Sequence, residues 1–312
     1  MKTFHPLACA LVAAGIALAA PAQAQAQDTA PARVTDADGQ VRLTRVTPEY
    51  WRVTLHNPPF NIFGPGTTPQ LNKVVTAIET DPQVKVVVFE SDVPGFFMTH
   101  YDFAPPLTET TGMAVGRTGL PPLPDMLVRL SKAPVVSIAE LRGRTTGVGS
   151  ELSLACDMRF ASREKAMLSQ FEIGAGFVPG GGPSARLPRL MGRGRALEVL
   201  MTGTYFDADL AERYGYVNRA LPDAQLDPFV DAMARRIAGF PKQTIADIKR
   251  LVDASSLPAD AQLGKEWQTF LDSVQRPAAQ ARIGELMKAG LQSNVELESH
   301  LDVHTGKLPP TD

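Results

Sequence analysis

The chain has 312 residues, of which 44% are hydrophobic, and a formal net charge of -2. This length is enough for one large domain, or two small ones, with a substantial core. The near-neutral charge gives no electrostatic reason to expect a nucleic-acid partner. We therefore expect a globular protein that does not bind nucleic acid.

The N-terminus has the pattern of a secretory signal peptide. Lys2 makes a short positive start, and residues 7–20 form an apolar run as long as a signal-peptide core. Residues 22–24 and 24–26 both fit cleavage between small residues, and the run is too short for a membrane span. A buried helix is the alternative, but the Gln/Ala/Pro stretch that follows cannot pack a core. We predict a signal peptide over 1–24, export to the periplasm or medium, and no membrane span in the mature chain.

The first half of the chain reads as alternating strands and helices. After a flexible leader over 25–38, residues 41–46 and 50–56 alternate apolar with polar residues and predict a β-hairpin. Helical spacing over 71–78 precedes a continuous apolar run over 84–89, which predicts a buried strand. The remaining predictions are a long loop over 91–116, a helix over 123–131 and a strand over 134–139.

The second half becomes helical towards its end. We predict helices over 150–155, 193–202 and 207–214, and strands over 157–162, 166–168 and 216–220. From 226 to about 289 the chain is amphipathic and helical, with breaks near Pro241, Pro258 and Pro277. This order predicts an α/β core over 39–223, a helical region over 224–304 and a frayed tail over 305–312.

Two glutamates each lie beside a glycine-rich stretch. Glu151 ends the sequence Gly-Val-Gly-Ser-Glu, and Glu172 precedes a glycine-rich run that ends at Gly182. Glycines let a backbone approach a ligand closely and direct its N–H groups at it. A carboxylate beside such a loop can transfer protons while the amides stabilise a developing negative charge. The pair predicts acid–base chemistry next to an oxyanion.

Other groupings are weaker. Ser150, His100 and Asp102 can be drawn as a nucleophilic triad, but Ser150 lacks the Gly-x-Ser-x-Gly elbow. His300 and His304 have a spacing that can bind a metal, yet no further ligands are near in sequence, so we expect no metal. The chain has no P-loop and no Gly-x-Gly-x-x-Gly after a strand, which gives nucleotide chemistry no support.

The order of motifs over residues 84–187 resembles the crotonase, or enoyl-CoA hydratase/isomerase, superfamily. Residues 96–102, Phe-Phe-Met-Thr-His-Tyr-Asp, occupy the place of the family's Ala-Phe-x-Ala-Gly-Ala-Asp. Residues 142–152 occupy the place of Asn-Gly-x-Ala-x-Gly-Gly-Gly-x-Glu-Leu, and a Cys-Asp pair follows. Residues 168–182 match Phe-x-x-Pro-Glu followed by Pro-Gly-x-Gly-Gly. The resemblance extends over about 40–255, and the motifs together are specific.

The resemblance implies a core of ββα units and a C-terminal helical region that builds homotrimers, often paired into homohexamers. It implies an oxyanion hole made by the backbone amides of Tyr101 and Val148. Glu151 matches the carboxylate that orients and deprotonates water, and Glu172 the one that supplies the α-proton. Members that only shift a double bond generally keep one of the pair, so the presence of both favours hydration.

The substrate and the role of the loop residues stay open at this point. We assign His100 and Gly149 to substrate binding, although His100 could also fill the loop or face solvent. The expected partner is a small acyl compound; no cofactor is needed, and coenzyme A would enter as part of a thioester substrate. Because export removes the protein from the cytoplasmic thioester pool, two alternatives remain. One is an isomerase or hydrolase acting on a carbonyl compound without coenzyme A, and the other is a binding protein without turnover.

Overall fold

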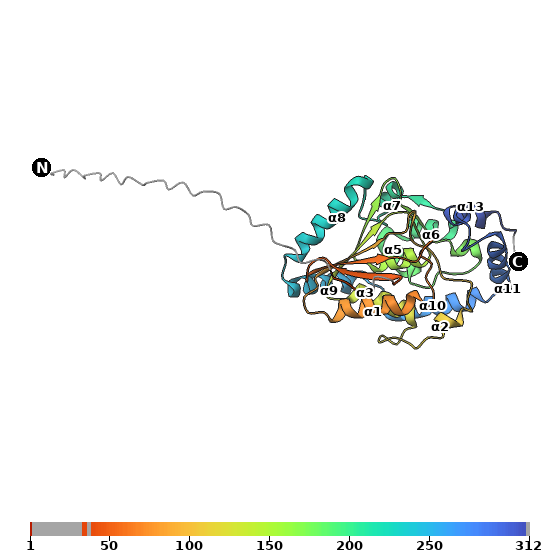
Figure 1. Ribbon diagram of the computed structural model, residues 1–312, viewed down its shortest axis with the longest axis horizontal. Coiled ribbons are helices and arrows are strands. Elements are labelled where there is room, and N and C mark those ends of the chain that lie inside the picture. The colour runs from red at the N-terminus through yellow and green to blue at the C-terminus, as the bar shows by residue number, and fades with distance from the viewer. Residues whose placement is uncertain (2–32, 36–38, 310–312) are drawn as a thin grey trace. The chain divides into compact units, whose positions relative to one another are not determined.

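The computed structural model describes Met1 and residues 33–35 and 39–309 (Figure 1). The predicted signal peptide and most of the predicted leader lie outside the described residues. Residues from Ala32 onward form one compact unit, which contains every described helix and strand. No described helix is both long and apolar enough to cross a bilayer.

A seven-stranded sheet forms the larger layer. Its order is β1-β2-β3-β4-β6-β8-β11, antiparallel from β1 to β3 and parallel from β3 to β11. The strands are β1 (Arg33–Thr35), β2 (Val41–Arg45), β3 (Tyr50–Leu55), β4 (Val86–Ser91), β6 (Val136–Leu141), β8 (Met158–Ser162) and β11 (Arg219–Leu221). The predicted hairpin is confirmed as β2 and β3. The leader prediction is wrong for Arg33–Thr35, because these residues pair with β2.

Both faces of this sheet are covered, which explains the continuous apolar run of β4. Val86 and Val88 pack with Leu226 and Val230 of α8 (Asp223–Ala238). Val87 and Phe89 belong to the main core, together with buried residues of α1 (Thr67–Thr80) and α3 (Pro122–Lys132). Figure 1 shows α8 on one side of the strands and α1 and α3 on the other. A strand buried on both faces has no polar alternation.

A partly buried ionic cluster joins α8 to the sheet. Arg52 of β3 contacts Glu90 of β4 at 2.6 Å, Glu140 of β6 at 3.3 Å and Asp227 of α8 at 2.7 Å. These three carboxylates lie close enough together to hold a metal ion. The guanidinium of Arg52 already bonds to all three, so the cluster is accounted for as a structural ion-pair network.

A smaller sheet brings the chemistry-bearing loops together. It has the order β10-β9-β7-β5, and β5, β7 and β9 are parallel. Its strands are β5 (Phe96–Met98), β7 (Arg144–Thr146), β9 (Met167–Ser169) and β10 (Phe206–Asp207). Because the carboxyl ends of parallel strands meet at one edge, the segments that follow them converge. These are the loop 99–103, helix α4 (Val148–Ala155) and the short helix η1 (Glu172–Ala175).

The sequence prediction missed three strands of this sheet, among them the two-residue β10. The predicted loop over 91–116 contains β5 and the short helix α2 (Thr108–Thr111), and β7 was not predicted. β5 and β7 have three residues each, too few for an alternating pattern to be read. Pairing with each other and with β9 defines them, so the missing information was tertiary.

The C-terminal half is helical and packs back on the core. The helices α5 (Pro183–Met191), α6 (Arg193–Thr202) and α7 (Ala208–Tyr214) precede α8, and α9 (Lys242–Ser256), α10 (Asp260–Val274), α11 (Pro277–Ala289), α12 (Val295–Ser299) and α13 (Leu301–Gly306) follow it. The predicted breaks near Pro241, Pro258 and Pro277 are confirmed. The tail prediction is wrong for 305–309, since Arg282 donates to the carbonyls of Thr305 and Pro309 at 2.9 and 2.8 Å.

Two glycines allow α4 to start against the loop after β5. A Cβ added to Gly149 would lie 1.9 Å from the Met98 carbonyl oxygen, and Gly149 donates its N–H to Thr99 at 2.9 Å. Gly147 has φ +50°, and a Cβ there would lie 3.2 Å from the Cα of His100. A side chain at either position would push the helix away from the loop.

We predict that Gly149→Ala destabilises the protein by about 2 kcal/mol or more, because the methyl group has no space. Gly194→Ala is the matched control: this exposed residue of α6 has nothing within 4 Å of an added Cβ. Urea unfolding of both variants measures the difference. Equal stabilities would contradict the close approach of α4 and β5.

Candidate active site

A small cavity lies where these three segments converge. Its volume is about 20 Å³, and its lining includes all four residues predicted for the acid–base pair and the oxyanion hole: Glu151, Glu172, Tyr101 and Val148. The remaining lining residues are His100, Phe103, Leu123, Phe171, Phe177, Pro179, Gly180, Trp267 and Phe270. This space holds about one water molecule. The structure therefore brings the predicted residues to one closed, largely aromatic cavity.

Glu151 is held by the glycine loop that crosses it. Its Oε1 accepts from the amides of Gly180 and Gly181 at 3.1 and 2.6 Å. A Cβ on Gly181 would lie 2.3 Å from Oε2, so only glycine allows this approach. Burial raises the pKa of Glu151 to about 7, and the two amides work against that rise by stabilising the charged form. Glu151 can therefore accept or release a proton near neutral pH.

Glu172 lies at the start of η1 and is 5% exposed. With its amide oriented to satisfy its partners, Gln170 donates to the Glu172 carboxylate at 3.0 and 3.2 Å and accepts from Ser150 at 2.5 Å. Burial, and then the negative charge of Glu151, raise the pKa of Glu172 well above that of an ordinary carboxyl. Glu151 and Glu172 therefore titrate as a pair, in which ionisation of one carboxyl opposes ionisation of the other.

A third buried acid, Glu266, was not predicted from the sequence. It belongs to α10, is 8% exposed and accepts from the Ser184 amide at 3.0 Å. Burial raises the pKa of Glu266 to about 7, and its charge in turn raises the pKa of both Glu151 and Glu172. The positive charge of buried Arg186 acts in the opposite direction on Glu151 and Glu266. No local motif marks Glu266, because only packing of α10 brings it near α4 and η1.

The two predicted oxyanion donors differ in how their amides are placed. Val148 is the first residue of α4, and no described atom accepts its N–H. Tyr101 forms a parallel bridge in which Phe63 donates to His100 and Asp102 donates to Phe63, at 2.9 and 2.8 Å. In such a bridge the N–H and C=O of Tyr101 point away from Phe63. This orientation, together with the helix start at Val148, suits amides that act on a ligand between the two segments.

His100 is fully enclosed and does not face solvent. It is 1% exposed, and its Nε2 lies 3.2 Å from each carboxylate oxygen of Glu298. The triad drawn from the sequence does not assemble: Ser150 bonds to the Tyr216 hydroxyl, and Asp102 Oδ1 accepts from a glutamine of the C-terminal segment. His100 does line the cavity, and its role in substrate binding stays a prediction.

Gly149 does not line the cavity, although its neighbour Val148 does. The amide of Gly149 donates to Thr99. The structure thus gives Gly149 a packing role, and substrate binding by this residue stays a prediction.

The side chains with metal-capable spacing near the C-terminus, His300 and His304, are not part of a metal-like cluster among the described residues. His300 Nδ1 lies near Glu296, and Asp302 accepts from the Tyr205 amide at 3.1 Å. Within the described ranges, these residues form no group with the geometry of a metal site.

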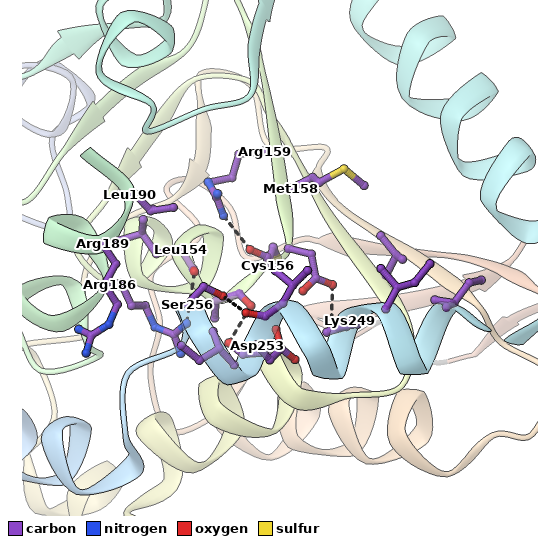
Figure 2. Close-up of a pocket in the computed structure, with 18 of the residues that line it drawn as sticks. Leu154, Cys156, Met158, Arg159, Arg186, Arg189, Leu190, Lys249, Asp253 and Ser256 are labelled. Carbon is purple, nitrogen blue, oxygen red and sulfur yellow. Dashed lines mark hydrogen bonds and ion pairs between the residues drawn. The ribbon is translucent and has the colours of Figure 1, made fainter. Parts of the chain in front are cut away.

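A larger cavity, of about 500 Å³, lies elsewhere among α4, α5, α8 and α9 (Figure 2). Lys249 donates to Asp157 at 2.8 Å, and Figure 2 shows Arg159 bonded to the Cys156 carbonyl, at 2.7 Å. Burial raises the pKa of the Cys156 thiol to about 12, so this thiol stays protonated and is a poor nucleophile at neutral pH. Neither Glu151 nor Glu172 lines this space. The small cavity is therefore the better candidate for catalysis.

We predict that Glu151→Gln stabilises the protein more at pH 8 than at pH 5. Glutamine Oε1 can still accept from Gly180 and Gly181 but carries no charge to bury. The unfolded carboxyl ionises near its ordinary value of 4.5, whereas the folded one ionises near 7. Wild-type stability therefore falls as the pH rises through this window, by about 3 kcal/mol in total. Urea unfolding at both pH values measures it, and a pH-independent difference would contradict the raised pKa.

Comparisons with known proteins identify the family of this chain. The family model for enoyl-CoA hydratase/isomerase matches residues 50–296. A crotonyl-CoA hydratase of Syntrophomonas wolfei is 33% identical over 179 residues, which are 57% of this chain and 67% of that protein. An (E)-benzylidenesuccinyl-CoA hydratase of Thauera aromatica is 32% identical over 60% of this chain and 72% of its own length. Other curated relatives, such as the methylglutaconyl-CoA hydratase of Mus musculus, are matched over about half of their length, 48% in that case.

A solved structure extends the match over nearly the whole fold. A protein of Streptomyces avermitilis, provisionally assigned as an enoyl-CoA hydratase, superposes with a TM-score of 0.82 and 41% identity. The superposition covers 87% of this chain and 98% of that one. The predicted crotonase-like α/β fold with C-terminal helices is confirmed. The chain belongs to the enoyl-CoA hydratase/isomerase family.

Proposed function

We propose that this enzyme adds water across the conjugated double bond of an enoyl-CoA thioester. The observation that carries the proposal is that two buried glutamates line one cavity with unequal proton affinities. Hydration needs a base for the water and an acid for the α-carbon, and this pair can supply both at neutral pH. Coenzyme A would enter only as part of the substrate.

Glu151 acts as the base in this mechanism. With Oε1 held by two amides, its other oxygen takes a proton from the water as the water oxygen bonds to the β-carbon. Electrons of the double bond then move towards the thioester carbonyl, whose oxygen becomes negative. The amides of Tyr101 and Val148 donate to that oxygen and stabilise the enolate.

Glu172 completes the addition by giving its proton to the α-carbon, which restores the carbonyl. The balance is one water consumed, one C–O bond and one C–H bond formed, and one carbon–carbon double bond lost. Glu151 then carries the proton that it took from the water, and Glu172 is ionised because its proton is on the α-carbon. Exchange with solvent after product release returns the pair to its starting state.

The aromatic walls must move to admit substrate. A cavity of about 20 Å³ holds a water but not an acyl group, and Phe103, Phe171, Phe177, Trp267 and Phe270 occupy the space around it. Their edge-to-face packing, such as Phe177 on Phe270 at 5.9 Å, leaves little room for water beside the two glutamates. This burial also sustains the raised pKa values on which the mechanism depends. The predicted export and the predicted homotrimer or homohexamer remain predictions.

We predict that Glu151→Gln and Glu172→Gln each lower kcat for hydration of a short enoyl-CoA by about 10²–10⁴-fold, because each removes a proton-transfer group. The fall in ultraviolet absorbance of the conjugated thioester measures the rate. Glu285→Gln makes the same chemical change on an exposed turn of α11 and should have no effect. Hydration that survives in both variants would disprove the roles. If the wild type shifts a double bond but adds no water, the isomerase alternative holds instead.

We predict a bell-shaped pH profile for kcat/KM. The rate should rise through an apparent pKa of about 7, where Glu151 becomes the ionised base. It should fall at higher pH, where Glu172 loses the proton it must donate. Initial rates from about pH 5 to 10 test this shape. A rising limb near pH 4–5, as for exposed carboxyls, would show that the pair is not buried during turnover.

A further inference from the structure

The C-terminal segment binds the loop that carries the Tyr101 amide. His100, Tyr101 and Asp102 follow β5 without regular structure of their own except the single bridge to Phe63. Gln292 and Glu298, about 190 residues further along the chain, contact this loop through side-chain bonds. We call Gln292 and Glu298, with their partners His100 and Asp102, the C-terminal latch.

We propose that Gln292 and Glu298 are positioning residues for the reaction, because the latch fixes the loop whose amide polarises the thioester carbonyl. This inference rests on the proposed function and deepens it. It assigns a role in catalysis to a segment that supplies no acid, base or oxyanion donor.

The His100–Glu298 contact is the first half of the latch. His100 Nδ1 lies 2.7 Å from the Tyr101 carbonyl oxygen, which can only accept, so Nδ1 carries a proton. Nε2 lies 3.2 Å from both oxygens of Glu298, and the two side chains are 1% and 0% exposed. The rings of Phe103 and Phe171 pack beside the imidazole, at 5.3 and 5.5 Å. The imidazole thus joins the Tyr101 peptide to α12.

The charged forms of His100 and Glu298 stabilise each other. Burial by itself would lower the pKa of His100, but the charge and hydrogen bond of Glu298, the Tyr101 carbonyl and the charge of Asp102 together raise it. Burial would raise the pKa of Glu298, but the charge and hydrogen bond of His100 and the Gln292 amide together lower it. Both shifts favour the charged forms of the two groups. A buried pair with good hydrogen bonds resists separation, because either partner alone would be uncompensated.

Gln292 forms the second half of the latch. Its side-chain oxygen accepts from the Phe103 amide at 3.0 Å, and its side-chain nitrogen donates to Asp102 at 2.6 Å. Its own backbone amide donates to Glu298 at 2.7 Å, which links the two halves. Gln292 also has φ +68°, a conformation that non-glycine residues rarely adopt. Bonds from one segment thus reach three loop residues, His100, Asp102 and Phe103, on either side of Tyr101.

Oxyanion stabilisation depends on where the donor points. A displaced backbone donor loses most of its effect on the transition state but little of the substrate's ground-state binding. Loss of the latch should therefore appear mainly in kcat, whereas a segment that only stabilises the fold should change the amount of folded enzyme and not its turnover.

The test compares four variants of the full chain. Glu298→Ala removes the partner of His100, whereas Glu298→Gln keeps a group that can bond to the neutral imidazole while Nδ1 still donates. Gln292→Asn keeps a residue that tolerates positive φ but shortens the reach to the loop. Tyr205→Phe is the matched control, since the Tyr205 hydroxyl donates to the backbone carbonyl of Glu298 at 3.2 Å and makes no bond to the loop.

We expect Glu298→Ala to lower kcat by about 100-fold with KM changed less than about threefold, and Gln292→Asn to act in the same direction. Glu298→Gln should recover most of the loss, and Tyr205→Phe should keep kcat within about twofold. Hydrogen exchange of the peptide containing residues 99–103, followed by mass spectrometry without substrate, should accelerate in Glu298→Ala and Gln292→Asn only.

The two readouts separate failure of this inference from failure of the proposed function. Unchanged exchange in Glu298→Ala and Gln292→Asn would overturn the latch whatever the reaction is. Faster exchange with unchanged kcat would overturn its role in positioning. If the wild type hydrates no enoyl thioester, the proposed function fails and the catalytic role of the latch with it, while the exchange data still decide whether the segment holds the loop.

Discussion

The parallel pairing of β5, β7 and β9 is the constraint on which the site depends. These three-residue strands place the ends of three distant segments at one edge of a small sheet. From that edge come the loop with Tyr101, the helix with Val148 and Glu151, and the short helix with Glu172. The contact of Gly149 with the Met98 carbonyl sets how close the first two can lie. Without this approach the two amides and the two acids would not share a cavity.

Burial then gives these ordinary carboxyls their chemistry. Glu151 and Glu172 lie among aromatic side chains, and Glu266 adds a third negative charge from α10. Desolvation and mutual repulsion raise their proton affinities, while the Gly180 and Gly181 amides lower that of Glu151. The unequal environments separate an acid from a base. This burial lowers the free energy of unfolding at neutral pH, because each buried carboxyl ionises less readily in the folded protein than in the unfolded chain.

The C-terminal helices contribute to the site as well as to the fold. Trp267 and Phe270 of α10 form part of the cavity wall, and the charge of Glu266 in the same helix raises the pKa of both Glu151 and Glu172. Further along, Gln292 and Glu298 bind the loop after β5. The helical region therefore does more than the assembly that the sequence resemblance implies. It supplies part of the cavity wall and, in our proposal, holds the loop that carries one of the oxyanion donors.

The sequence by itself determined the fold family, the hairpin, the buried strand β4, the proline-bounded helices and the two glutamates beside glycines. Each of these is encoded locally, by periodicity, by proline or by a motif of fixed spacing. Only the tertiary structure decided β5 and β7, the enclosure of His100 by Glu298 and the place of Glu266 beside the catalytic pair. These features join residues that are tens to hundreds of positions apart. Short strands and single buried charges leave no periodic trace in the sequence, because packing against distant segments is what defines them.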